Sequence, residues 1–125
     1  MKMLTGMTAM LGFFAVALGA FGAHLLQGTT APEMLNLWQT GVQYQMFHVL
    51  ALLSVIVAAN RHYTVLWSVV GWLFVMGSII FSGSLYLLVI TGIKAFGMIT
   101  PIGGSMFLVG WLILSFAMTR TLVKS

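Results

Sequence analysis

Residues 64–91 read TVLWSVVGWLFVMGSIIFSGSLYLLVIT, a long apolar stretch without a charged side chain. An α-helix needs about 20 apolar residues to cross the hydrocarbon core of a bilayer. The stretch is therefore long enough to span a membrane, and nothing in it opposes burial in lipid. It predicts a transmembrane helix.

Three further apolar runs of span length cover residues 3–26, 33–59 and 101–122. Residues that end or begin helices separate the runs: Pro32 and Pro101 suit a first helical turn, and Gly92 suits a C-terminal cap. We expect an all-α fold, an integral membrane four-helix bundle, with residues 1–125 as a single transmembrane domain. We expect the first helix to be retained rather than cleaved as a signal peptide, because its apolar run is of span length.

The composition supports a membrane protein and excludes several other classes. Hydrophobic residues make up 61% of the chain and charged residues 5%, whereas soluble domains average roughly 45–50% and about 25%. Six charges cannot cover a soluble surface of this size, which argues against a soluble enzyme, a nucleic-acid binder and a disordered chain. The absence of cysteine excludes disulfides, iron–sulfur clusters and thiolate metal sites.

The charged residues predict the orientation in the membrane. In a four-span arrangement Lys2, Arg61, Arg120 and Lys124 fall on one side, and Glu33 and Lys94 fall on the other. Basic residues favour the cytoplasmic side, so we expect both termini in the cytoplasm, in a bacterial inner (plasma) membrane. The basic residues stand singly, without the patch that binds nucleic acid.

Two tryptophans and several small residues predict how the helices are placed. Trp38 and Trp67 fall near opposite interfaces, as members of aromatic belts would. Small residues let helix backbones approach closely in lipid, so their regular spacing predicts tight helix packing. Two such stripes occur, one at Thr8, Gly12, Ala15, Gly19 and Gly22, the other at Ser68, Gly71, Ser78 and Ser82.

The least lipid-like part of any span is residues 39–48, QTGVQYQMFH. At 100° per residue Thr40, Tyr44 and His48 share one side, with Gln45 adjacent. A second row contains Asn36, Gln39 and Gln43. Unpaired amides in hydrocarbon cost several kcal/mol, so these rows must face other helices, water or a ligand.

Depth along the spans suggests partners for these polar residues. Counted at about 1.5 Å per residue, His48 and Ser82 both fall near the midplane, while Tyr44 and Tyr86 match nearer the outer surface. Either the cluster is a hydrogen-bond network that fixes helix register, or it is a pocket that opens outward. The candidate pocket residues are His24, Gln39, Gln43, Tyr44, Gln45, His48, Ser82 and Tyr86.

The sequence gives little support for a metal site, a cofactor, catalysis or proton-coupled export. His24 and His48 are separated by more than about 10 Å in depth, too far for one mononuclear metal site, so we expect no metal or cofactor, although a haem with one axial histidine stays open. No nucleophile, base and acid occur together, so we expect no enzyme. Small four-span multidrug exporters rely on a carboxylate inside the first helix, and this chain has none there.

Four sequence blocks carry a resemblance to a known family. They are residues 19–24 (GAFGAH), 38–48 (WQTGVQYQMFH), 81–86 (FSGSLY) and 99–104 (ITPIGG). In this order they resemble the bacterial inner-membrane family called domain of unknown function 423, which is related to the transmembrane protein 256 group. The resemblance covers essentially the whole chain. It implies a small multi-pass membrane protein and supplies no catalytic assignment.

Two functions are compatible with the sequence. The first is an accessory or structural membrane protein that acts through helix–helix contacts, as a homo-oligomer or in a larger membrane complex within the lipid bilayer. The second is a small-solute carrier, or a binder of an amphipathic ligand such as a quinone or lipid, in an outer-leaflet pocket centred on Tyr44 and His48.

Overall fold

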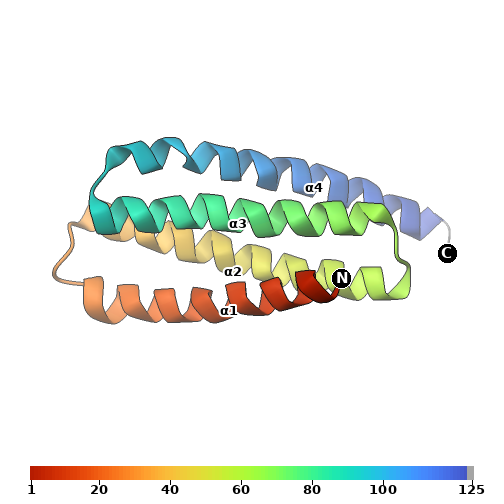
Figure 1. Cartoon of the computed structure of the whole chain (residues 1–125), viewed down its shortest axis with the longest axis horizontal. Helices are drawn as coiled ribbons and strands as arrows, with labels where there is room; N and C mark the ends of the chain where they lie inside the picture. Colours follow the sequence, from red (N-terminus) through yellow and green to blue (C-terminus); the bar gives the residue numbers. More distant parts are fainter. Residues whose placement is uncertain (124–125) are drawn as a thin grey trace.

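The computed structural model describes residues 1–123, which form four long helices joined by short connections (Figure 1). Two short helical turns, η1 (a π-helical turn) and η2 (a 3-10 turn), accompany the long helices. The elements are α1 (Lys2–Phe21), η1 (Gly22–Leu26), α2 (Pro32–Arg61), α3 (Val65–Thr91), η2 (Lys94–Met98) and α4 (Thr100–Val123).

The predicted fold class is confirmed. Four helical segments are long and apolar enough to cross a membrane, and residues 1–123 contain no strand. The helix limits follow the signals in the sequence: Pro32 stands in the first turn of α2, and Gly92 ends α3 in the left-handed conformation with φ 70°. The backbone N–H of Gly92 donates to the carbonyl of Leu88, which satisfies one of the free carbonyls at the helix end.

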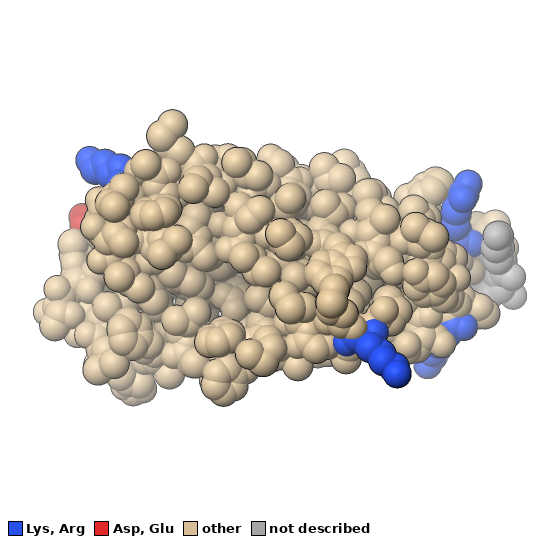
Figure 2. Space-filling model, viewed as in Figure 1, with Lys and Arg blue, Asp and Glu red and all other residues tan. Residues whose placement is uncertain are grey.

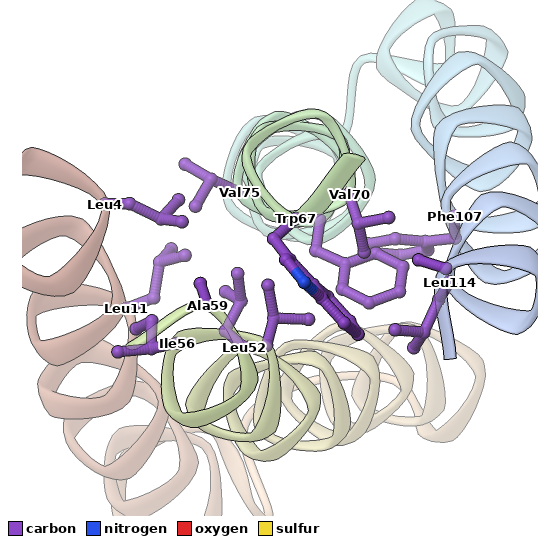
Figure 3. Close-up of a cluster of buried hydrophobic side chains, with 13 residues drawn as sticks. Leu4, Leu11, Leu52, Ile56, Ala59, Trp67, Val70, Val75, Phe107 and Leu114 are labelled. Carbon is purple, nitrogen blue, oxygen red and sulfur yellow. The ribbon is translucent and has the colours of Figure 1, made fainter. Parts of the chain in front are cut away.

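Helix α3 lies at the centre of the bundle and contacts all three other long helices (Figures 1 and 3). Helix α1 packs on α2 and α3, whereas α4 packs on α3. Within residues 1–123, the backbones of α2 and α4 do not come into close contact. The bundle is therefore open along the boundary between α2 and α4, which we call the α2–α4 seam.

The hydrophobic core is assembled around α3, where Val70, Phe74 and Val75 are fully buried. Leu4 and Leu11 enter this core from α1, and the other two long helices add to it (Figure 3). Their core residues are Leu52, Val55, Ile56 and Ala59 from α2, and Phe107, Leu114 and Ala117 from α4.

Small residues allow the close helix approaches, as predicted. Along α1, Ala15 is buried, and an added Cβ at Gly19 would lie 3.3 Å from the Val42 side chain of α2. Between α3 and α4, an added Cβ at Gly103 would lie 2.5 Å from the backbone nitrogen of Phe81. These glycines therefore face neighbouring helices inside the bundle rather than lipid.

Trp38 and Trp67 stand near opposite ends of the bundle, as expected, but their rings point inward and do not form lipid-facing belts. Trp38 is 1% exposed and Trp67 is 2% exposed. Each indole N–H donates to a backbone carbonyl, Trp38 to Leu18 at 2.8 Å and Trp67 to His62 at 3.0 Å. A buried indole needs such an acceptor, and both rings find one inside the protein.

Charged side chains lie at the two ends of the molecule, and the long apolar flank between them carries almost none (Figure 2). Glu33 is in the first turn of α2, and Arg61 is its last residue. Arg120 is in the last turn of α4. Lys124, which contributed to the predicted orientation, lies outside the described residues.

Candidate functional site

His48 joins α2 to α4 across the seam. Its Nδ1 lies 2.7 Å from the carbonyl oxygen of Tyr44, and its Nε2 lies 3.1 Å from Nε1 of Trp111. A carbonyl oxygen only accepts and an indole N–H only donates. The proton is therefore on Nδ1, the ring is neutral, and both of its nitrogens are occupied.

Aromatic stacking holds the same imidazole from the side of α4. The His48 ring is stacked on Phe107 with a centroid separation of 3.5 Å and an interplanar angle of 9°. Within residues 1–123, the bond from Trp111 is the one hydrogen bond between α2 and α4. We call His48 and Trp111 the bridge, because they connect two helices whose backbones do not meet.

A groove of about 770 Å³ lies on the seam beside the bridge. Helix α2 forms one wall and α4 the other, and the Phe81 side chain of α3 contributes between them. We call it the aromatic groove. Its lining residues are Gln43, Tyr44, Phe47, His48, Phe81, Pro101, Gly104, Ser105, Phe107, Leu108 and Trp111.

The aromatic groove is apolar along its length and polar toward one end. From Pro101 to Trp111 it follows about 15 Å of α4, from the start of that helix to its middle. Tyr44 is 46% exposed and stacks on Phe81 at a centroid separation of 4.6 Å. Gln43 is exposed nearby. The groove thus has flat aromatic walls, with an amide and a phenol as polar groups.

A second set of polar residues lies on the other side of α2, away from the seam. The Gln45 amide Nε2 donates to the carbonyl of Leu11 at 2.8 Å, and its Oε1 accepts from the Tyr86 hydroxyl at 2.8 Å. The Ser82 hydroxyl donates to the carbonyl of Gly41 at 2.6 Å. We call this the three-helix junction, because its direct hydrogen bonds join α1, α2 and α3.

The structure divides the eight predicted pocket residues into three groups. Gln43, Tyr44 and His48 line the aromatic groove. Another three form the three-helix junction: Gln45, Ser82 and Tyr86. His24 and Gln39 are exposed and lie in neither place. The two proposed roles, a structural network and a pocket, therefore belong to different faces of α2.

The pairing predicted from depth is wrong by about one to two helical turns. Ser82 lies level with Gly41 rather than His48, and Tyr44 stacks on Phe81 rather than meeting Tyr86. The register of α2 against α3 is set by a close approach at Gly41, where an added Cβ would lie 2.9 Å from the Tyr86 ring. This contact between two helices cannot be predicted by counting residues from the ends of apolar runs.

A metal or haem finds little support in the arrangement. Among residues 1–123, no three His, Cys, Asp or Glu side chains are grouped as metal ligands. Both nitrogens of His48 already have partners, so an axial haem bond would require breaking the bridge. His24 is exposed at the other end of the polar region, in η1.

Sequence reasoning did not identify the aromatic residues that form most of the groove: Phe47, Phe81, Phe107 and Trp111. Polar side chains guided the prediction from sequence, so these aromatic residues were assigned no role in a site. Trp111 carried a usable signal, since it stands in the middle of α4. Tryptophan in spans prefers the interfaces, and its N–H needs an acceptor when buried, so a mid-span tryptophan indicates a polar partner.

Comparison with known proteins places this arrangement in a family. The family described as "Protein of unknown function (DUF423)" matches residues 18–104. The chain belongs to this family. The matched range contains seven of the eleven groove residues and the junction side chains Gln45, Ser82 and Tyr86, whereas Ser105, Phe107, Leu108 and the bridge residue Trp111 lie beyond it. No solved structure matches the chain.

Curated relatives cover nearly the full chain. A UPF0382 membrane protein of Staphylococcus aureus is 46% identical over 118 residues, 94% of this chain and 95% of the relative. UPF0382 membrane protein YwdK of Bacillus subtilis is 42% identical over 98% of this chain and 100% of its own length. UPF0382 inner membrane protein YgdD of Escherichia coli is 44% identical, covering 82% and 79%. The chain is a small multi-pass bacterial membrane protein.

Proposed function

We propose that the protein binds a lipid-soluble, ring-bearing amphipathic molecule, such as a quinone, in the aromatic groove. The observation that carries the proposal is the groove itself, about 770 Å³ with aromatic walls and a polar end. Ligand sites are typically clefts of about 300–1,000 Å³ with apolar linings and a few polar groups. The proposal is one of binding, without a chemical reaction.

The groove chemistry indicates how such a molecule would lie. A flat ring would stack between the side chains of Tyr44 and Trp111, as aromatic rings do at separations of about 4.5–7 Å. Carbonyl or hydroxyl groups on the ring would reach Gln43 and Tyr44, which can both donate hydrogen bonds. His48 would act as part of the wall, because its nitrogens serve the bridge.

Tryptophan fluorescence tests this proposal with the purified full chain in detergent. A short-chain benzoquinone quenches nearby indoles, so binding beside Trp111 should give saturable quenching that is much reduced in Trp111→Phe. Ser105→Phe should fill the groove, since Ser105 is an exposed lining residue whose hydroxyl bonds only to its own helix at Pro101. We expect it to weaken binding about tenfold, equivalent to about 1.4 kcal/mol.

The matched control is Val109→Phe. Val109 is exposed on the same helix but does not line the groove, so binding should be unchanged. Linear, unsaturable quenching that is equal in all variants would overturn the proposal, because it would reflect partition of the quinone into the micelle.

The alternative is an accessory or structural membrane protein that acts through helix–helix contacts. The glycines at close approaches do not supply such a contact surface, because Gly12 and Gly19 approach α2, and Gly77, Gly103 and Gly110 lie between α3 and α4. The mass of the protein in mild detergent tests this alternative. A stable homo-oligomer or a co-purifying membrane protein would favour it over the ligand proposal.

The orientation with both termini in the cytoplasm is also proposed, on the excess of basic residues at one end. The sequence has no cysteine, so labelling of a single introduced cysteine shows on which side of the membrane that residue lies. His62→Cys should react with a membrane-impermeant maleimide only after the cells are opened, whereas Gln27→Cys should react in intact cells. The reverse pattern would invert the orientation and place the aromatic groove in the inner leaflet.

A further inference from the structure

A second groove lies on the same seam, beyond the bridge. It has a volume of about 700 Å³ and is lined by α2, by α4 and by Trp67 at the start of α3. Its apolar part includes Val57 and Met118, and Arg61 and His62 form its basic end, at the α2–α3 connection. We call it the basic groove. It shares no lining residue with the aromatic groove.

We propose that the basic groove binds an anionic phospholipid, with the phosphate on Arg61 and His62 and an acyl chain along the apolar part. Three observations support this proposal: the charge at the end of the groove, the apolar wall beneath it, and the position of that end at the membrane surface.

The charge of Arg61 has no side-chain counterion. The single Asp or Glu of the sequence is Glu33. Glu33 is in the first turn of α2 and Arg61 is the last residue, so about 42 Å of helix separates them. An arginine with no carboxylate to pair with is suited to phosphate, because its planar guanidinium presents paired donors to the phosphate oxygens.

Apolar surface continues directly from the basic end toward the middle of the bundle. Along α2 the groove is lined by Val57 and Ser54, one and two helical turns before Arg61. Met118 faces it from α4. A phosphate at the surface with a chain of methylene groups beneath it matches this order, whereas a free phosphate would leave the apolar wall uncovered.

The position in the bundle places Arg61 at headgroup depth. Basic side chains gather at the end that carries the α2–α3 connection (Figures 1 and 2). Basic pockets between transmembrane helices bind anionic lipid headgroups. Arg120 is less suited to the role, because its guanidinium already lies over the Phe116 ring at 4.6 Å.

Native mass spectrometry of the full chain in detergent tests the proposal with phosphatidylglycerol and phosphatidylcholine as probes. We expect phosphatidylglycerol to bind more tightly than phosphatidylcholine. Arg61→Gln should weaken phosphatidylglycerol binding about fivefold, the equivalent of about 1 kcal/mol for one basic side chain near anionic lipid. Arg61→Lys should retain part of the affinity.

Two further variants distinguish a lipid bound in the basic groove from a general effect of the protein's net charge on lipid binding. Ser54→Phe keeps every charge and fills the apolar part, since Ser54 is an exposed lining residue; we expect it to weaken phosphatidylglycerol about as much as Arg61→Gln. Lys2→Gln removes a charge from α1, which does not line the groove, and should have little effect. Circular dichroism checks that each variant folds.

Three results would overturn the proposal: equal affinity for the two lipids, an unchanged affinity in Ser54→Phe, or an equal loss in Lys2→Gln and Arg61→Gln. The test is independent of the quinone proposal. Ser105→Phe, which fills the aromatic groove, should leave phosphatidylglycerol binding unchanged.

Discussion

Helix α4 meets its two neighbours in opposite ways. Against α3 it presents glycine, so that an added Cβ at Gly103 would lie 2.5 Å from backbone nitrogen and 2.8 Å from Cα of Phe81. Against α2 it presents Trp111, whose indole reaches His48 across the seam. The first contact brings the backbones together and leaves no space, whereas the second holds them apart and leaves a groove on each side of the bridge.

The comparison shows that residue size decides where a membrane bundle is closed. In lipid there is no hydrophobic drive between helices, so backbone approach depends on small residues and on hydrogen bonds. Where α3 meets its neighbours, glycine and serine permit contact. Along the seam, large aromatic side chains lie between the helices, and a hydrogen bond and ring stacking connect them across it.

The largest predicted effect breaks the close contact between α3 and α4. In Gly103→Ala the new methyl group meets the backbone of Phe81, which cannot rotate away, so the helices must separate. We expect a loss of about 2–3 kcal/mol in the free energy of unfolding, as for overpacking in other cores. Unfolding in sodium dodecyl sulfate, followed by far-ultraviolet circular dichroism, measures it.

The adjacent glycine is the control for this prediction. An added Cβ at Gly104 would lie 3.8 Å from the Phe81 ring, an ordinary contact. Gly104→Ala should therefore change stability by less than about 0.5 kcal/mol. Equal losses at both positions would show that the backbone approach at Gly103 is not the determining contact.

The next effect concerns the three-helix junction. Gln45→Ala removes the acceptor of the Tyr86 hydroxyl and the donor to Leu11, and Gln45 is 3% exposed. Leaving a buried polar group unsatisfied costs about 1–3 kcal/mol, and we expect a destabilisation of about 1–2 kcal/mol. Gln43→Ala, at an exposed position on the same helix, should be nearly neutral in the same unfolding assay.

A smaller effect on stability is expected for the hydrogen bond between His48 and Trp111. A double-mutant cycle with His48→Phe and Trp111→Phe keeps the aromatic rings and removes the hydrogen bond between them. We expect a coupling free energy of about 0.6 kcal/mol, the average for hydrogen bonds between transmembrane helices. A coupling of zero would mean that stacking on Phe107 alone holds the seam.

The smallest effect on stability is expected at Ser78, a buried residue of α3. The Ser78 hydroxyl is buried with no hydrogen-bond partner among the described residues, whereas the Ser82 hydroxyl donates to Gly41. Ser78→Ala should therefore leave the free energy of unfolding nearly unchanged, within about 0.5 kcal/mol. Ser82→Ala should lower it by about 0.6 kcal/mol. A larger loss from Ser78→Ala would reveal a partner for its hydroxyl.

Features that depend on local sequence could be predicted. The helix limits follow from apolar runs and from Pro32 and Gly92, which act within one turn of their own positions. The role of the glycine stripe on α1 followed from spacing alone, because side chains three and four residues apart share a helix face.

Features that depend on two helices at once could not be predicted. Gln45 and His48 are neighbours on one helix surface, yet one points to α1 and α3 and the other to α4. Which partner each finds is set by the α2–α3 register at Gly41 and by the absence of an α2–α4 backbone contact. The inward-facing Trp38 and Trp67 show the same limit, since belt residues and buried anchors occupy the same depth.

The two hydrogen bonds of His48 also have an electrical consequence. They keep the imidazole neutral in the middle of α2, and the described charged side chains stand toward the helix ends (Figure 2). Moving one charge through a membrane potential changes its energy by about 2.3 kcal/mol per 100 mV. With no charged side chain in the interior, the potential has little to act on, and the voltage dependence of binding in the aromatic groove would reflect the charge of the bound molecule.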